Sequence, residues 1–191
     1  MAELQHGAAA SELAVELPFR RPSVLRIAAA FAAAALVACA FAEFGLGARA
    51  FIGAFFVSVL VVLSVVDLEQ RRLPNRIVLP ATLIVLGAQV VFYPERAPEW
   101  LLASLGAAVF FFVPQLVYPA GVGMGDVKLA LLLGAALGEA VILALLLAGL
   151  ASLPIALAML ARGGIAARKT AIPFGPFLAA GSIVALFLGD F

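Results

Sequence analysis

The sequence predicts an all-α, polytopic membrane protein, and three observations support that fold class. Of its 191 residues, 65% are hydrophobic, and the mean hydropathy is +1.19. Charged residues make up 12% of the chain, about half of the roughly 25% that is typical of soluble domains. The apolar runs are long and continuous, which favours membrane-spanning helices over the short alternating segments of a β-barrel.

The chain divides into two regions by composition. Residues 1–23 form its one sizeable polar stretch and are expected to be a cytoplasmic N-terminal segment. Residues 24–191 are expected to form a single membrane-embedded domain, with the lipid bilayer as a partner. A net charge of +1 argues against nucleic acid as a partner. Cys39 is the one cysteine of the sequence, which excludes an internal disulfide and a cysteine-based zinc site. No cofactor is expected, because the two-carboxylate chemistry described below needs none.

About seven spans, six to seven, are predicted from the apolar runs. They cover residues 24–43, 50–67, 76–93, 100–118, 126–138, 140–161 and 172–189. Two other interpretations of the first run stay open. It could be a signal peptide cut near Ala42, or a lipoprotein signal in which Cys39 is acylated after cleavage.

Two features of the sequence fix the predicted topology. The apolar stretch from Val127 to Leu160 would make a single helix of about 51 Å, whereas a hydrocarbon core is about 30 Å thick. A break is therefore predicted at Gly138-Glu139. Basic residues concentrate on the cytoplasmic side of a membrane, and with the N-terminus in the cytoplasm ten of the twelve Lys and Arg lie on that side, all except Arg49 and Arg96.

Two aspartates in this apolar chain are candidates for chemistry. Asp67 ends the second run, and Asp126 follows Gly123 and Gly125 at the start of the fifth. A carboxylate at membrane depth is costly to hold, so each is a functional candidate. In the predicted topology both lie at cytoplasmic ends of spans. Two neighbouring carboxylates around one water can share a proton and supply the acid and the base for peptide hydrolysis, without a metal.

Residues beside the two aspartates are candidates for substrate binding, and other interpretations of the aspartates also stay open. Gly123 and Gly125 would let a substrate backbone approach and let the loop adopt a positive φ before the helix begins. Lys128 is a candidate for substrate binding or a topology anchor. Asp126 could instead be a helix N-cap, and Asp67 an ordinary helix-end residue.

Two other functions also stay open. The protein could be a transporter that uses the two aspartates as an ion or proton relay, or it could be a structural subunit.

Three blocks of sequence carry a resemblance to a known family. Gly123-Met124-Gly125-Asp126 matches the Gly-x-Gly-Asp signature of membrane-embedded aspartic peptidases, and it continues as Val127-Lys128-Leu129. Asp67 is followed by Arg72-Leu73-Pro74-Asn75, and Pro173-Phe174-Gly175-Pro176-Phe177 opens the last span. Together these blocks resemble the type IV prepilin peptidases, in a short form like those of tight-adherence (Flp) pilus systems.

The resemblance implies an activity, a site and a location. It implies that Asp67 and Asp126 are the catalytic residues of an aspartic endopeptidase in the bacterial inner membrane. The substrates would be prepilins or pseudopilins with a short basic leader, cut at the cytoplasmic membrane face just before their hydrophobic helix. Larger members of the family carry two Cys-x-x-Cys pairs and also N-methylate the new terminus. Because this sequence has Cys39 alone, methyltransferase activity is not expected. The pilin that is cleaved and the oligomeric state are not predicted.

Overall fold

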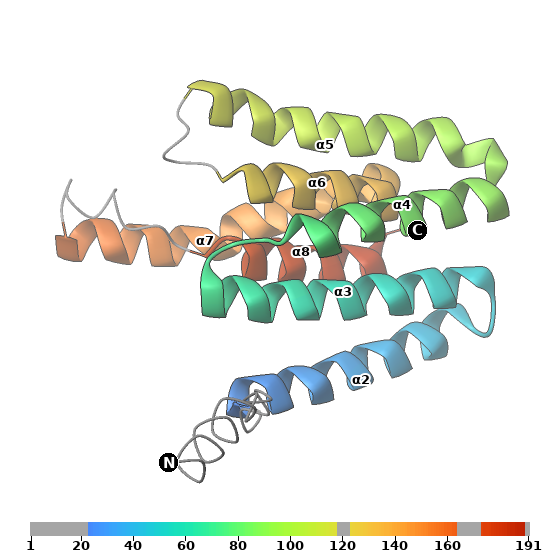
Figure 1. Cartoon of the computed structure of the whole chain (residues 1–191), viewed down its shortest axis with the longest axis horizontal. Helices are drawn as coiled ribbons and strands as arrows, with labels where there is room; N and C mark the ends of the chain where they lie inside the picture. The colour runs from blue at the N-terminus through green and yellow to red at the C-terminus, as the bar shows by residue number, and fades with distance from the viewer. Residues whose placement is uncertain (1–22, 118–122, 164–172, 190–191) are drawn as a thin grey trace, which may run out of the picture.

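The fold is a bundle of α-helices whose long axes run roughly alongside one another (Figure 1). The computed structural model describes residues 23–117, 123–163 and 173–189. In order, the helices are α2 (Val24–Phe44), α3 (Ala48–Gln70), α4 (Asn75–Phe92), η1 (Pro94–Arg96), α5 (Ala97–Val117), α6 (Met124–Leu137), η2 (Gly138–Ala140), α7 (Val141–Gly163) and α8 (Gly175–Leu188). Both η elements are single turns of 3₁₀ helix. The predicted all-α fold class is confirmed.

The helices have the length and composition of membrane spans. Within the described ranges, five stretches are long and apolar enough to cross a membrane, and α8 is a shorter apolar helix. The last of the five, Met124–Ala158, includes the turn between α6 and α7. The chain is therefore a multi-pass membrane protein, and the helices agree with the approximate count of six to seven spans. The predicted N-terminal segment lies outside the described residues, except for Ser23, which caps α2.

The break predicted at Gly138 is confirmed. Helix α6 ends at Leu137, Gly138 has a φ of 55°, and α7 then runs back alongside the bundle (Figure 1). A β-carbon at Gly138 would collide with the Glu99 carboxylate and press on the Trp100 ring, so glycine is required for space as well as for φ. The resulting α6 is central: it contacts α3, α4, α5 and α8. Nearly all of its residues from Val127 onward are buried.

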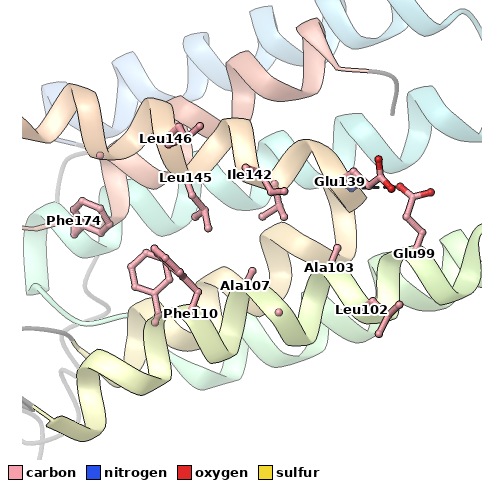
Figure 2. A pocket seen from close by; sticks show the side chains of 14 residues that line it. Glu99, Leu102, Ala103, Ala107, Phe110, Glu139, Ile142, Leu145, Leu146 and Phe174 are labelled. Carbon is pink, nitrogen blue, oxygen red and sulfur yellow. Dashed lines mark hydrogen bonds between the residues drawn. The ribbon is translucent and has the colours of Figure 1, made fainter.

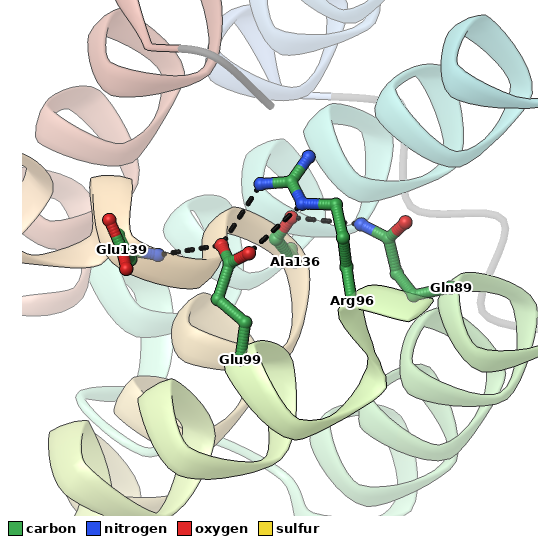
Figure 3. Close-up of polar contacts among 5 residues, drawn as sticks. All are labelled: Gln89, Arg96, Glu99, Ala136 and Glu139. Atoms are coloured by element: carbon green, nitrogen blue, oxygen red, sulfur yellow. Dashed lines mark hydrogen bonds and ion pairs between the residues drawn. The ribbon is translucent and has the colours of Figure 1, made fainter. Parts of the chain in front are cut away.

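Polar contacts hold this turn from the side of α4 and α5 (Figure 3). The Arg96 guanidinium donates to both carboxylate oxygens of Glu99, at 2.9 and 3.0 Å. Glu99 in turn accepts the backbone N–H of Glu139 at 3.3 Å, and the Gln89 amide donates to the carbonyl of Ala136 at 3.1 Å. Backbone groups that a turn frees inside a membrane protein need such partners. The cluster therefore supports the reversal between α6 and α7.

Two helix boundaries differ from the predicted ones in a way that bears on the site. The second apolar run was expected to end at Asp67, but α3 continues to Gln70, so Asp67 lies in the last turn of the helix. The helix ends where Arg71 takes a left-handed conformation (φ 51°) and donates its N–H to the Asp67 carbonyl at 2.8 Å. The last span begins at Gly175 instead of residue 172. Both differences follow from local capping, which apolar runs do not encode.

The packing between α5 and α6 gives a test of the fold. A β-carbon at Gly134 would collide with the backbone of Ala103 and Ser104 on α5. We expect Gly134→Ala to push the two helices apart and to lower the free energy of unfolding by about 1–3 kcal/mol, the usual cost of overpacking. Unfolding of the purified protein in detergent measures this change. Gly87→Ala is the matched control, because nothing lies within 4 Å of a β-carbon there; equal stability of the two variants would contradict the described packing.

Candidate active site

Asp67 is held in place by the start of α8. Its Oδ2 accepts the backbone N–H of Gly175 at 2.9 Å, and the residue is only 6% exposed. Gly175 is the first residue of α8, so the carboxylate lies at a helix N-terminus, where N–H groups are free and negative charge is stabilised. A β-carbon at Gly175 would lie 2.7 Å from the same oxygen. Asp67 is therefore enclosed by the protein, unlike an ordinary helix-end residue.

Asp126 lies in the first turn of α6 and is partly buried. Gly123 is the N-cap of the helix, and its carbonyl accepts the N–H of Asp126 at 3.0 Å. The alternative that Asp126 is itself the N-cap is therefore wrong. Its carboxylate turns back toward Gly123, because Oδ2 lies 3.4 Å from the position of a β-carbon on that glycine. The carboxylate thus faces the end of the bundle and not its apolar centre.

Neither of the two motif glycines has a positive φ. Gly123 has a φ of −76°, so the positive φ expected before the helix is wrong at this residue. Gly121 lies outside the described residues. Gly125 is needed for close packing, since a β-carbon there would come within 3.1 Å of Cβ of Leu73. The signal for Leu73 was present in the sequence, in the Arg72-Leu73-Pro74-Asn75 block, but its contact could not be inferred from spacing.

A second contact joins the same two segments. Lys128 on α6 donates from Nζ to Oδ1 of Asn75, at 2.8 Å. Asn75 is the first residue of α4, so this bond and the Gly125–Leu73 contact fasten the connection between α3 and α4 onto the start of α6. Lys128 therefore has a protein partner.

The structure brings the two predicted aspartates to the same end of the bundle. Helices α3 and α6 contact one another, with Asp67 in the last turn of α3 and Asp126 in the first turn of α6. The three motif blocks converge here: the start of α6 packs on Leu73, and the start of α8 binds Asp67. Such a pair of carboxylates can act as a general acid and a general base. No group of three or more His, Cys, Asp or Glu that could hold a metal occurs in the described ranges.

A groove that the sequence did not predict begins beside this site. It lies between α5 and α7, has a volume of about 750 Å³, and is lined by apolar side chains except for Glu99 and Glu139 (Figure 2). These two glutamates lie at one end of the groove, and Phe174 lies at the other. Phe174 immediately precedes Gly175, the partner of Asp67. We call this feature the α5–α7 groove.

Comparison with known proteins gives one family. Residues 54–157 match the model of the type IV leader peptidase family. A prepilin leader peptidase/N-methyltransferase of Bacillus subtilis is 31% identical over 89% of this chain and 68% of its own length. Proteins of the same name from Xanthomonas campestris and Burkholderia pseudomallei are 35% and 31% identical, over 78% and 83% of this chain. No solved structure matches.

The coverage limits what these relatives say about methylation. The chain spans 68% of the Bacillus subtilis relative and 53% of the other two, about half of their length. The family and the names of the relatives support leader cleavage, and none of them favours a transporter. The expected lack of methyltransferase activity stays a prediction.

The contact between the α3–α4 connection and α6 can be tested directly. We expect Leu73→Cys with Gly125→Cys, in a Cys39→Ser background, to form an internal disulfide on mild oxidation. The β-carbons would lie 3.1 Å apart, a few tenths of an ångström below the usual range for a disulfide of about 3.5–4.5 Å. Thiol labelling followed by mass measurement detects the bond. Leu73→Cys with Gly87→Cys is the control and should remain reduced; a pair at 73 and 125 that also remains reduced would refute the contact.

Proposed function

This chain belongs to the type IV leader peptidase family, and we propose that it is an aspartic endopeptidase that cleaves the leader of type IV prepilins or pseudopilins. The observation that carries the proposal is the placement of Asp67 and Asp126 at the same end of the bundle, on two helices that contact one another. Each residue belongs to a different helix and to a different motif block. Their convergence is what a two-carboxylate hydrolase requires.

The chemistry follows from two carboxylates that share one proton and one water. Both cannot ionise cheaply side by side, so one is protonated and the other ionised. The ionised carboxylate removes a proton from the water, whose oxygen attacks the carbonyl carbon of the scissile peptide. The protonated carboxylate first donates to the carbonyl oxygen, and a proton then passes to the leaving nitrogen as the C–N bond breaks. The titration that governs the rate belongs to the pair.

The motif residues around the pair have distinct proposed roles. Gly123 is exposed at the start of α6, which supports the close approach of an extended substrate backbone. Gly125 and Lys128 would serve substrate binding through the α3–α4 connection, which they hold by Leu73 and Asn75. Gly175 is proposed as a positioning residue, because its N–H fixes the Asp67 carboxylate.

The proposed location is the bacterial inner membrane, with the site facing the cytoplasm. Support comes from the distribution of positive charge between the two ends of the bundle. The end that carries the aspartates also carries Arg26, Arg71, Arg72, Arg76 and Lys128. Arg49 and Arg96 lie at the opposite end, where they stack on Tyr93 and Trp100. Positive charge marks the cytoplasmic side of membrane proteins, and a basic leader that remains in the cytoplasm would reach a site on that side.

The aspartates give the decisive test. We expect Asp67→Asn and Asp126→Asn each to lower leader cleavage by at least about a hundredfold, because each removes one partner of the acid–base pair. The assay is cleavage of a candidate prepilin by purified protein in lipid vesicles, with insertion of each variant checked. Glu43→Gln, at an exposed carboxylate in the last turn of α2, is the control and should cleave normally. Normal cleavage by either aspartate variant would remove the proposal.

The hydrogen bond at Gly175 gives a second, finer test. In Gly175→Ala the new methyl group would lie 2.7 Å from Oδ2 of Asp67, so the carboxylate or the start of α8 must move. A displacement of about 1 Å can lower a catalysed rate by about a hundredfold. We expect kcat to fall by up to about a hundredfold, with a much smaller change in KM. Gly87→Ala should behave as the wild type. An unchanged kcat would show that this contact does not position Asp67.

A further inference from the structure

We propose that the α5–α7 groove binds the apolar helical segment of the substrate that follows the scissile peptide bond. The groove would thereby set the depth at which the substrate meets Asp67 and Asp126. This inference rests on the proposed function, because it concerns how the same site selects its substrate. Apart from Phe174, the residues that line this proposed binding surface lie outside the three motif blocks.

The first argument is the form of the groove. Its walls are one face of α5, with Leu102, Gly106 and Phe110, and one face of α7, with Ile142 and Leu146 (Figure 2). The side chains on these walls are between 61% and 71% exposed at Leu102, Phe110, Ile142 and Leu146. No helix of the described chain covers them. The lining is apolar along its length and ends at Glu99 and Glu139.

The second argument is that the length and the open space of the groove suit a helix. From Glu99 to Phe111 the α5 wall is about 18 Å long, which corresponds to roughly twelve residues of a bound helix. A β-carbon at Gly106 or Gly149 would meet nothing within 4 Å, so small residues on both walls leave open space. Membrane helices associate by close packing on such small residues. A helical occupant also satisfies its own backbone groups, which an extended apolar peptide in lipid would not do.

The third argument is continuity with the aspartates. The Phe174 ring lies at one end of the groove, and its centroid is 6.1 Å from that of the Phe111 ring. The next residue, Gly175, donates its N–H to Asp67. A chain that leaves the carboxylates therefore passes Phe174 and enters the groove. The proposed substrate is cut just before an apolar helix, so its apolar segment must begin within a short distance of the pair.

Filling the groove tests the inference. In Gly106→Leu with Gly149→Leu the new side chains would enter the open space on both walls. We expect the KM for a prepilin that carries its complete apolar segment to rise roughly tenfold, which corresponds to about 1.4 kcal/mol of binding free energy, with little change in kcat. Gly87→Leu is the matched control: it is also mid-helix and open, but it lies on α4 outside the groove. It should keep the KM of the wild type.

A cross-linking measurement keeps the inference testable if the filled variant folds poorly. We expect a benzophenone amino acid in place of Leu146, in an Asp126→Asn background, to cross-link to the apolar segment of the prepilin. The same group in place of Leu83, which is 72% exposed on α4, should not do so. If the wild type cleaves no prepilin, the proposed function itself fails. If the wild type cleaves but the filled groove leaves KM unchanged, or cross-links form only to lipid or to a second copy of the chain, the groove proposal fails while the peptidase stands.

Discussion

The bond between Asp67 and the first N–H of α8 is the interaction on which the arrangement of the helices depends. A carboxylate enclosed by apolar helices needs a polar partner, because an unpaired one is costly to bury. The partner of Asp67 comes from a residue more than a hundred positions later, so α8 must begin at the end of the bundle where α3 ends. The chain can return to that end only if α6 and α7 reverse direction between them. The turn at Gly138 supplies this reversal.

The two ends of the bundle therefore have different tasks. At the end with the aspartates, glycines leave room for neighbouring side chains that a β-carbon would displace: Gly175 lies beside Asp67, and Gly125 beside Leu73. At the other end the polar groups are paired, with Arg96 on Glu99 and Glu99 on the backbone of Glu139. The paired end fixes the length of α6, and through α6 it fixes where Asp126 lies relative to Asp67. A structural cluster far from the aspartates thus contributes to their geometry.

Much of this arrangement could be predicted from the sequence because it follows from hydropathy and charge. The apolar runs identify the helices, the length of the run after Val127 requires the break at Gly138, and the cost of a carboxylate in apolar surroundings identifies Asp67 and Asp126. The neighbours of each helix do not follow from these signals. The contact of Lys128 with Asn75 and the hydrogen bond from the Gly175 N–H to Asp67 depend on which helices are adjacent, and apolar faces in a membrane do not encode that order.

The α5–α7 groove shows that the role of a glycine on a membrane helix depends on which helix lies next to it. In the sequence, Gly106 and Gly149 are typical of small residues at which membrane helices pack closely. Gly134 and Gly181 are used in that way, because a β-carbon on either would collide with the backbone of a neighbouring helix. Gly106 and Gly149 are not, and both face the groove. Four glycines of the same kind therefore divide into two that pack against a neighbouring helix and two that face a surface that no described helix covers. Because this surface is apolar, leaves open space at its glycines and begins beside Asp67, it is suited to a helix from another chain.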